Sequence, residues 1–122
     1  MIVFDTGALI ALERRKQRML EVWAAARALY KPIIAPAVVV GEWWRGRTDR
    51  REAILAGVRV VPVDEGLARL SGEALAATPR ATVIDAMVMG LAARYDAVVY
   101  TSDVDDLERL RSFFPGVRVL AS

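Results

Sequence analysis

The sequence contains no cysteine and no histidine. Without cysteine, the chain can form neither a disulfide scaffold nor a thiolate metal site. Without histidine, it has no imidazole ligand, no imidazole base and no Ser-His-Asp triad. Lysine is scarce as well, since only Lys16 and Lys31 stand among 17 basic residues. These absences leave oxygen ligands, above all carboxylates, as the candidates for binding a metal ion.

Long apolar runs are also missing. No run can cross a bilayer, and no basic segment precedes the apolar residues at the N-terminus. We therefore expect a cytoplasmic protein that does not enter a membrane. With 122 residues, the chain is expected to form one domain, residues 1–122, with a sizeable core. Its hydrophobic fraction of 55% excludes a disordered or low-complexity chain.

Three apolar runs each carry a single acid. Asp5 lies in the run 2–12, Glu42 in the run 33–44 and Asp85 in the run 82–93. A buried carboxylate is unfavourable unless another group replaces its water, and no lysine or histidine lies near Asp85 in sequence. The pattern raises the hypothesis that these acids converge on a cation.

The net charge is +2, and the rest of the molecule is more positive than this if a cluster of acids is neutralised by metal. The remaining basic residues are mostly arginines, which form forked contacts to phosphate. An anionic site in a cationic surround suits a polyanionic substrate.

Short β-branched and aromatic runs alternate with segments of helical spacing along the chain. The predicted strands are residues 2–5, 33–35, 58–63, 97–101 and 117–120, with Pro62 indicating an edge or strand-end position. Helices are predicted from residue 7, over 19–30, 36–44 and 64–77, from residue 83, and over 104–113, with a short one within 45–52. This alternation predicts an α/β fold with a central, mainly parallel sheet of four to five strands and helices on both faces.

This topology can bring four acids together. Asp5 and Asp103 stand at the carboxyl ends of predicted strands, and Glu42 and Asp85 are expected in early turns of helices that begin on the same side. Two carboxylates about 4 Å apart repel by ~4 kcal/mol at an effective dielectric near 20. Oxygen-only ligands favour Mg²⁺ or Mn²⁺, and such ions support phosphodiester hydrolysis.

The segments that carry these acids resemble the four acidic motifs of PIN-domain ribonucleases. They read VFDTGALI around Asp5, VGEWWRG around Glu42, IDA around Asp85 and TSDVDDL around Asp103. The whole chain resembles the small VapC-type toxins of toxin–antitoxin modules.

The resemblance implies a Mg²⁺- or Mn²⁺-dependent endoribonuclease that acts on RNA, forms a homodimer and is inhibited by a cognate antitoxin. It identifies the catalytic and metal-binding acids as Asp5, Glu42, Asp85 and Asp103. Thr101 matches the hydroxyl residue of the fourth motif and is expected to steady the cluster. Either Asp105 or Asp106 could assist Asp103.

Each acid also has a purely structural interpretation. Asp5 could cap a helix, and Asp85 and Asp105 stand three residues after Thr82 and Ser102, as in a capping box. Glu42 could be a surface acid, Asp103 a turn residue, and Asp106 an exposed helix acid.

The basic and aromatic residues near these motifs leave alternatives open. The arginines and lysine of 14–18 could line an RNA path or form a solvated face, and those of 45–51 could form surface ion pairs with Asp49 and Glu52. Trp43 and Trp44 face different sides of a helix, so at least one is expected in the core, and the other could contact an antitoxin or a second subunit.

Two other functions are compatible with parts of the pattern. A catalytically silent PIN-like module would bind RNA or an antitoxin without cleaving RNA. A phosphoacceptor receiver domain has a similar length and fold but needs a lysine after its last strands, where this chain has none.

Overall fold

A computed structural model describes residues 1–122 and contains one five-stranded sheet. The strands are β1 (Ile2–Phe4), β2 (Ile33–Pro36), β3 (Arg59–Val61), β4 (Val98–Thr101) and β5 (Val119–Ala121). Their order is β3-β2-β1-β4-β5, and every neighbouring pair is parallel. The predicted α/β fold with a parallel sheet is therefore confirmed.

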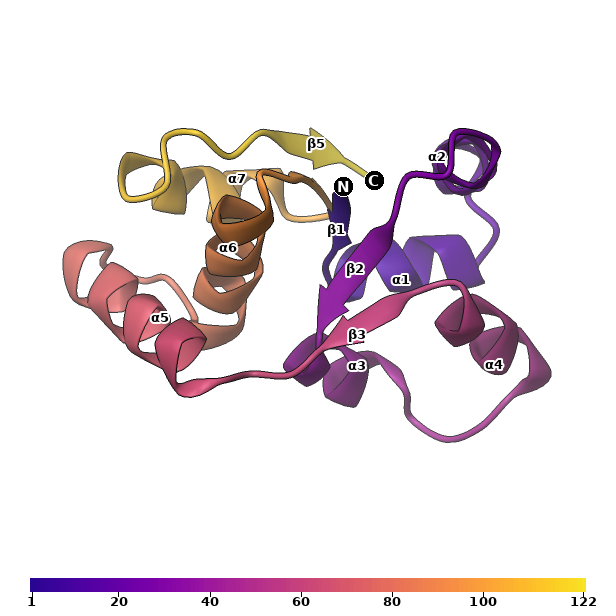
Figure 1. The fold of residues 1–122 in the computed structure, drawn as a ribbon, viewed down its shortest axis with the longest axis horizontal. Helices are drawn as coiled ribbons and strands as arrows, with labels where there is room; N and C mark the ends of the chain where they lie inside the picture. Colours follow the sequence, from indigo (N-terminus) through magenta and orange to yellow (C-terminus); the bar gives the residue numbers. More distant parts are fainter.

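Helices cover both faces of this sheet (Figure 1). They are α1 (Thr6–Glu13), α2 (Gln17–Ala28), α3 (Ala37–Trp43), α4 (Asp49–Ala56), α5 (Glu65–Ala77), α6 (Val83–Tyr95) and α7 (Val104–Glu108). Figure 1 shows α5, α6 and α7 on one side of the strands and α1, α2 and α4 on the other. None of the helices combines the length and apolar character that a membrane crossing requires.

Most predicted elements are present, and some of their ends differ from the prediction. The third strand ends at Val61 rather than at residue 63, because Pro62 has no N–H to donate to a ladder. The edge position of β3 agrees with that proline. The last helix is shorter than predicted, since α7 gives way to a 3₁₀ helix at Arg109–Ser112.

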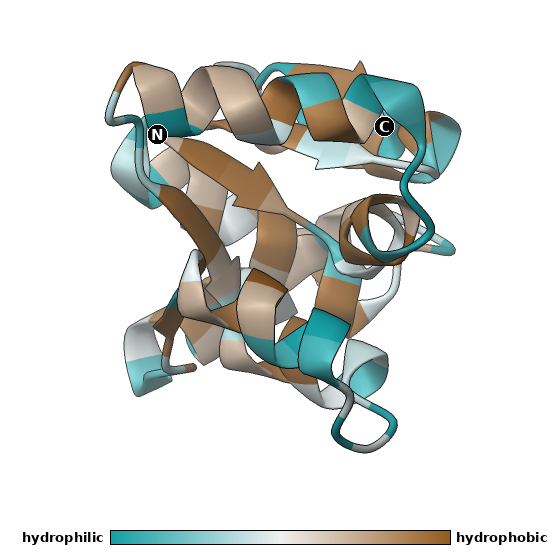
Figure 2. Cartoon of the chain, turned by 90° about the vertical axis from the view of Figure 1, so that its right-hand side faces the viewer, coloured by the Kyte–Doolittle hydropathy of each residue, from teal (hydrophilic) through white to brown (hydrophobic).

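The core lies between the sheet and the helices on its two faces. All three residues of β1 are buried, and α6 buries Ala86, Val88, Met89, Leu91 and Ala92. Figure 2 shows the corresponding hydrophobic band through the central strands. Burying a large apolar side chain contributes roughly 1.5–3 kcal/mol. The prediction that residues 83 onward form a largely buried helix is thus confirmed.

The strand order reverses beside β1. The chain passes from β1 outward to β2 and β3, and then returns to place β4 on the other side of β1. The register pairs Phe4 with Tyr100, so both strands end at the same level. In sheets of this kind the crevice beyond the carboxyl ends at the reversal point is where ligands bind. Asp5 and Asp103 follow these two strand ends.

Candidate functional site

A cavity of about 470 Å³ lies beyond the carboxyl ends of β1 and β4, and acids dominate its lining. All four acids predicted from the sequence line this acidic cavity, and they come from four separate segments of the chain. The lining residues are Asp5, Thr6, Gly7, Ile10, Glu42, Thr82, Ile84, Asp85, Ser102, Asp103 and Asp106.

Asp5 is the most buried of these acids, with 8% of its surface exposed. It is the N-cap of α1, and its Oδ1 accepts a hydrogen bond of 2.8 Å from the Ala8 N–H. Burial raises the pKa of Asp5 to about 6, although hydrogen bonds from Thr101 and Ala8 favour the carboxylate. The charges of Asp85 and Asp103 raise this pKa further. Asp5 therefore caps a helix and also faces the other acids, so the two interpretations of this residue are compatible.

Asp85 lies in the first turn of α6 and is half-buried. The Thr82 hydroxyl accepts a hydrogen bond of 3.2 Å from the Asp85 N–H, which is the Thr82 part of the predicted capping box. Burial raises the pKa of Asp85, and the charges of Asp106, Asp103 and Glu42 add to that effect. The cap fixes the backbone of Asp85 while its carboxyl group faces the acidic cavity.

Glu42 is exposed and lies in the last turn of α3, so its predicted position in an early helical turn is wrong. Because α3 contains only seven residues, its end still reaches the acidic cavity. The Thr6 hydroxyl donates a hydrogen bond of 2.6 Å to Glu42 Oε1. This bond links the start of α1 to the end of α3 and orients the Glu42 carboxylate.

Asp103 is exposed at the end of β4, and a buried threonine ties it to Asp5. The Thr101 hydroxyl accepts a hydrogen bond of 2.9 Å from the Asp103 N–H and bonds to the Asp5 carboxyl group. Thr101 is fully buried. The expectation that Thr101 steadies the cluster agrees with this geometry.

The two acids that follow Asp103 differ in position. Asp106 lines the acidic cavity and forms an ion pair of 3.1 Å with Arg109, whereas Asp105 is exposed and lies outside the lining. No side-chain cap bond forms at the start of α7, so the predicted capping role of Ser102 and Asp105 is not observed. Of the two, only Asp106 is placed to assist the four predicted acids.

The acids share one cavity without forming a compact set, because no group of three or more lies close enough to act together as metal ligands. Mutual repulsion favours such spacing, since each pair at about 4 Å would cost ~4 kcal/mol at an effective dielectric near 20. The side chains that could hold a divalent ion are Asp5, Glu42, Asp85 and Asp103, and all their donors are oxygens.

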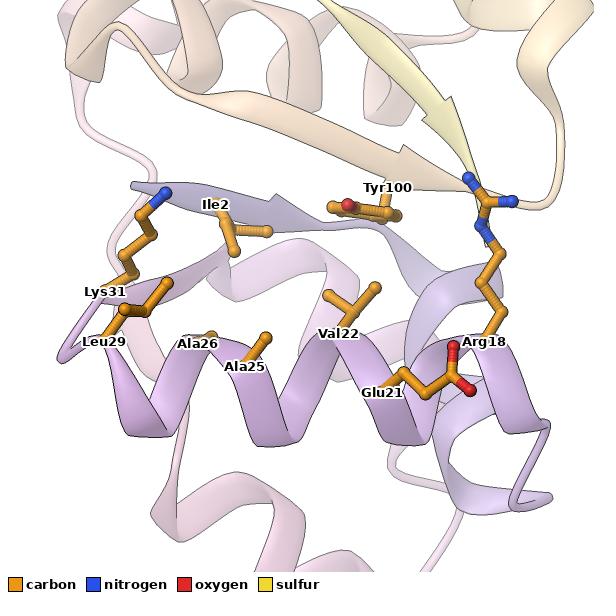
Figure 3. Close-up of a pocket in the computed structure, with 9 residues that line it drawn as sticks. All are labelled: Ile2, Arg18, Glu21, Val22, Ala25, Ala26, Leu29, Lys31 and Tyr100. Atoms are coloured by element: carbon orange, nitrogen blue, oxygen red, sulfur yellow. The ribbon is translucent and has the colours of Figure 1, made fainter.

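A second cavity, of about 400 Å³, runs along α2 against β1 and β4 and has a different chemistry (Figure 3). Apolar side chains of Val22, Leu29 and Ile2 line it, and Tyr100 lies above α2. Glu21 is the only acid among the lining residues. Because this groove lacks converging carboxylates, we assign the chemistry to the acidic cavity.

Gly7 allows the first turn of α1 to lie against the segment that follows β4. A Cβ atom at position 7 would overlap Ser102 Oγ and lie 2.9 Å from Ser102 Cβ. Sequence reasoning had no signal for this close approach, which brings a residue just after Asp5 against the residue just before Asp103.

Gly7→Ala is therefore expected to destabilise the protein by ~1–3 kcal/mol, as overpacking does. Gly72→Ala, in α5, is the control, because a Cβ atom there meets no atom within 4 Å. The control should gain about 0.5–1 kcal/mol from the helical preference of alanine. Urea unfolding of both variants measures the difference, and equal midpoints would contradict the tight fit at Gly7.

The positions of Trp43 and Arg47 settle part of what the sequence left open. Trp43 is buried and donates a hydrogen bond of 2.8 Å from Nε1 to Glu13 Oε1, which confirms that one of the pair is in the core. Trp44 is half-buried against the Trp43 ring. Arg47 forms the predicted surface ion pairs with Asp49 and Glu52.

Comparison with known proteins gives one family and several similar folds. The family model described as PIN domain matches residues 2–112. No curated protein matches the chain.

One similar solved structure is VapBC2 from Rickettsia felis bound to a promoter DNA fragment. It has a TM-score of 0.80 at 12% identity, covering 100% of this chain and 99% of that chain. DNA-bound VapBC from Salmonella typhimurium has a TM-score of 0.73 at 19% identity, with 98% and 96% covered. VapC20 from Mycobacterium tuberculosis, described as a toxin that cleaves the sarcin–ricin loop, has a TM-score of 0.66 at 22% identity, with 87% and 92% covered. At these identities the likeness establishes the shared fold.

Proposed function

The chain belongs to the PIN-domain family, and from this premise we propose that it is a metal-dependent endoribonuclease and the toxin of a toxin–antitoxin pair. One observation carries the proposal: four acids from distant segments line a single cavity at the strand reversal. Its proposed catalytic and metal-binding residues are Asp5, Glu42, Asp85 and Asp103.

The donor chemistry of the acidic cavity suits a hard divalent ion, whose charge would offset the repulsion that keeps the carboxylates apart. The donors are carboxylate oxygens with no sulfur or imidazole among them, which suits Mg²⁺ or Mn²⁺. The pKa of Asp5 and that of Asp85 are both raised, so each carboxyl group would be stabilised in its charged form by a cation. When bound, such an ion would activate a water molecule and neutralise charge on the scissile phosphate.

The protein's own groups would orient that ion and the substrate. The Ala8 N–H and the Thr101 hydroxyl hold the Asp5 carboxyl group, and the Thr6 hydroxyl holds that of Glu42. Holding the carboxylates through such partners is how neighbouring groups tune a metal site. The exposed Glu42 and Asp103 leave the acidic cavity open to a long substrate such as RNA.

Several features of the proposal come from the family rather than from the acidic cavity. Solved complexes named VapBC share the fold, which supports a cognate antitoxin as a partner. A homodimer and a cytoplasmic location are also proposed, both from the resemblance to VapC-type toxins alone.

The direct test is RNA cleavage by the purified protein. Cleavage is expected with Mn²⁺ or Mg²⁺ and is expected to stop when EDTA is added. Mass spectrometry of the fragments would verify that phosphodiester bonds were cut. RNA binding without any metal-dependent cleavage would instead identify the catalytically silent module.

Metal binding can be measured independently of cleavage. Mn²⁺ at a hundred times its dissociation constant should stabilise the fold by about 2.7 kcal/mol, because it binds only the native state. Asp5→Asn/Asp85→Asn should lose this effect, whereas Glu73→Gln/Asp105→Asn should keep it, since both control residues are exposed and lie outside the acidic cavity. Equal melting shifts in the two double variants would exclude the proposed ligands.

A further inference from the structure

A third cavity, of about 270 Å³, adjoins the acidic cavity and is lined by several arginines. Thr6, Ile10 and Glu42 line both cavities, so the two form one continuous surface. The additional residues of the third cavity are Glu13, Arg14, Trp43, Arg45 and Arg51. A cationic surface thus begins where the acidic one ends.

Of these arginines, Arg51 has its charge compensated. Its Nη2 lies 3.1 Å from Glu13 Oε2, and its Nε donates to Glu13 Oε1. The same Glu13 accepts the Trp43 hydrogen bond. Arg51 is therefore a structural residue, and its side chain is only 20% exposed.

Arg14 and Arg45 differ from Arg51, because neither takes part in any ion pair of the structure. Both are exposed. The only hydrogen bond that the Arg45 guanidinium makes runs from Nε to the Glu42 carbonyl, at 3.1 Å. Its two terminal nitrogens have no protein partner, and they are the groups that make forked contacts to phosphate.

The backbone that carries Arg45 is held in an unusual conformation. Arg45 has a φ of +46° and Gly46 a φ of +99°, so two consecutive residues lie in the left-handed region. Arg51 Nη1 donates to the carbonyls of both residues, at 3.4 Å and 3.0 Å. Only Arg45 is strained here, because glycine adopts a positive φ freely, and the Arg51 guanidinium holds the turn in place. The turn leaves the Arg45 guanidinium beside Glu42, where its Nε donates to the Glu42 carbonyl.

We propose that Arg14 and Arg45 form a phosphate-binding shelf that holds the RNA backbone next to the scissile bond. The inference rests on the proposed nuclease function. A polyanion lying across both cavities would place one phosphate among the acids and a neighbouring phosphate on the two arginines. The shelf thus sets the direction in which the strand crosses the acidic cavity, without selecting a base.

RNA binding without cleavage tests the shelf. Fluorescence anisotropy with a single-stranded RNA is measured in EDTA, with Asp5→Asn as the common background. Arg14→Ala/Arg45→Ala is expected to weaken binding at least tenfold. It should also flatten the slope of log affinity against log salt by about 1.4, because each phosphate contact on single strands contributes roughly 0.7.

A matched control removes two positive charges at positions outside both cavities. Arg69→Ala/Arg118→Ala deletes two exposed arginines that line neither cavity, and it is expected to change the affinity less than threefold. If alanine at position 45 disturbs the turn at residues 45–46, Arg45→Gly is used instead, because glycine adopts a positive φ without strain. Equal affinities and salt slopes for the shelf and control variants would overturn the proposal.

The outcomes separate this inference from the proposed function. If the wild type never cleaves RNA but the shelf variant still loses binding, the nuclease proposal fails, and the two arginines are a phosphate-binding site on a module that does not cleave RNA. If the wild type cleaves RNA and the shelf variant binds like the control, the shelf fails. Unchanged RNA binding together with weakened antitoxin binding would assign the two arginines to protein recognition and overturn the shelf.

Discussion

Asp5→Asn is expected to abolish RNA cleavage and, at the same time, to stabilise the metal-free protein. Cleavage should fall at least ~10³-fold, because the variant loses the most buried carboxylate of the proposed metal site. The fold should survive, since the asparagine side-chain oxygen can still accept the Ala8 N–H that caps α1.

The gain in stability follows from the pKa of Asp5. Its pKa is about 6 in the folded protein and 3.8 in the absence of the fold. Between these values the native state binds the extra proton, so the free energy of unfolding decreases as pH rises through this range. The loss is complete above the folded pKa and amounts to roughly 3 kcal/mol, because each unit of pKa corresponds to about 1.4 kcal/mol. Asparagine cannot ionise and avoids this loss.

Two measurements check the Asp5 prediction. Urea unfolding in EDTA should show a larger advantage of Asp5→Asn at pH 7.5 than at pH 4.5. Cleavage assays with Mn²⁺ should show full activity for Asp105→Asn, a control that changes an exposed acid outside the acidic cavity. An active Asp5→Asn, or one that is less stable than the wild type at pH 7.5, would contradict the assignment.

The fold could be predicted because its signals are local. The apolar run from residue 83 with its threonine cap predicted helix α6. The alternation of apolar runs and helical segments predicted all five strands. The strand ends that were missed depend on pairing, as at β5, which begins at Val119 where the sequence favoured residue 117. There the register of the neighbouring β4 decides which residues join the ladder.

The sequence identified the four acids of the acidic cavity, but it did not identify most of the other residues that line it. Thr6 adjoins Asp5 in sequence, but its bond to Glu42 spans 36 residues and depends on how α1 packs on α3. Asp106 was given an exposed position, yet the turn at the start of α7 brings it to the lining. Sequence patterns identify which carboxylates a sheet edge can gather, whereas the distances among them depend on tertiary packing.

Which arginines form ion pairs likewise could not be predicted from the sequence. In the segment 45–51, Arg47 and Arg51 are paired with acids, while Arg45 is left free by a backbone with two positive φ values. Sequence favoured one surface network for all of these arginines. The difference arises because Arg51 reaches back to Glu13, which lies 38 residues earlier.

Thr101→Val is expected to reduce cleavage by about 10–100-fold, which is the usual effect of removing a partner that orients a metal ligand. The substitution retains the shape of a fully buried side chain but deletes the hydroxyl that joins Asp5 to Asp103. The Asp103 N–H then loses its acceptor, and the Asp5 carboxylate loses one of two hydrogen bonds that favour its charged form. Stability should decrease by ~1–3 kcal/mol, as for other unpaired polar groups.

A shift in the pH dependence distinguishes a positioning role of Thr101 from a merely structural one. Because the lost hydrogen bond lowers the pKa of Asp5, valine should raise that pKa, and the acidic limb of the cleavage profile should move to higher pH. Thr101→Ser keeps the hydroxyl and removes only a methyl group, so its profile should match the wild type even if its melting temperature falls. If Thr101→Val lowers stability but leaves the acidic limb in place, the hydroxyl serves only to pack the end of β4. A shifted limb restored by serine would instead show that this buried hydroxyl opposes the effect of burial and favours the charged form of Asp5.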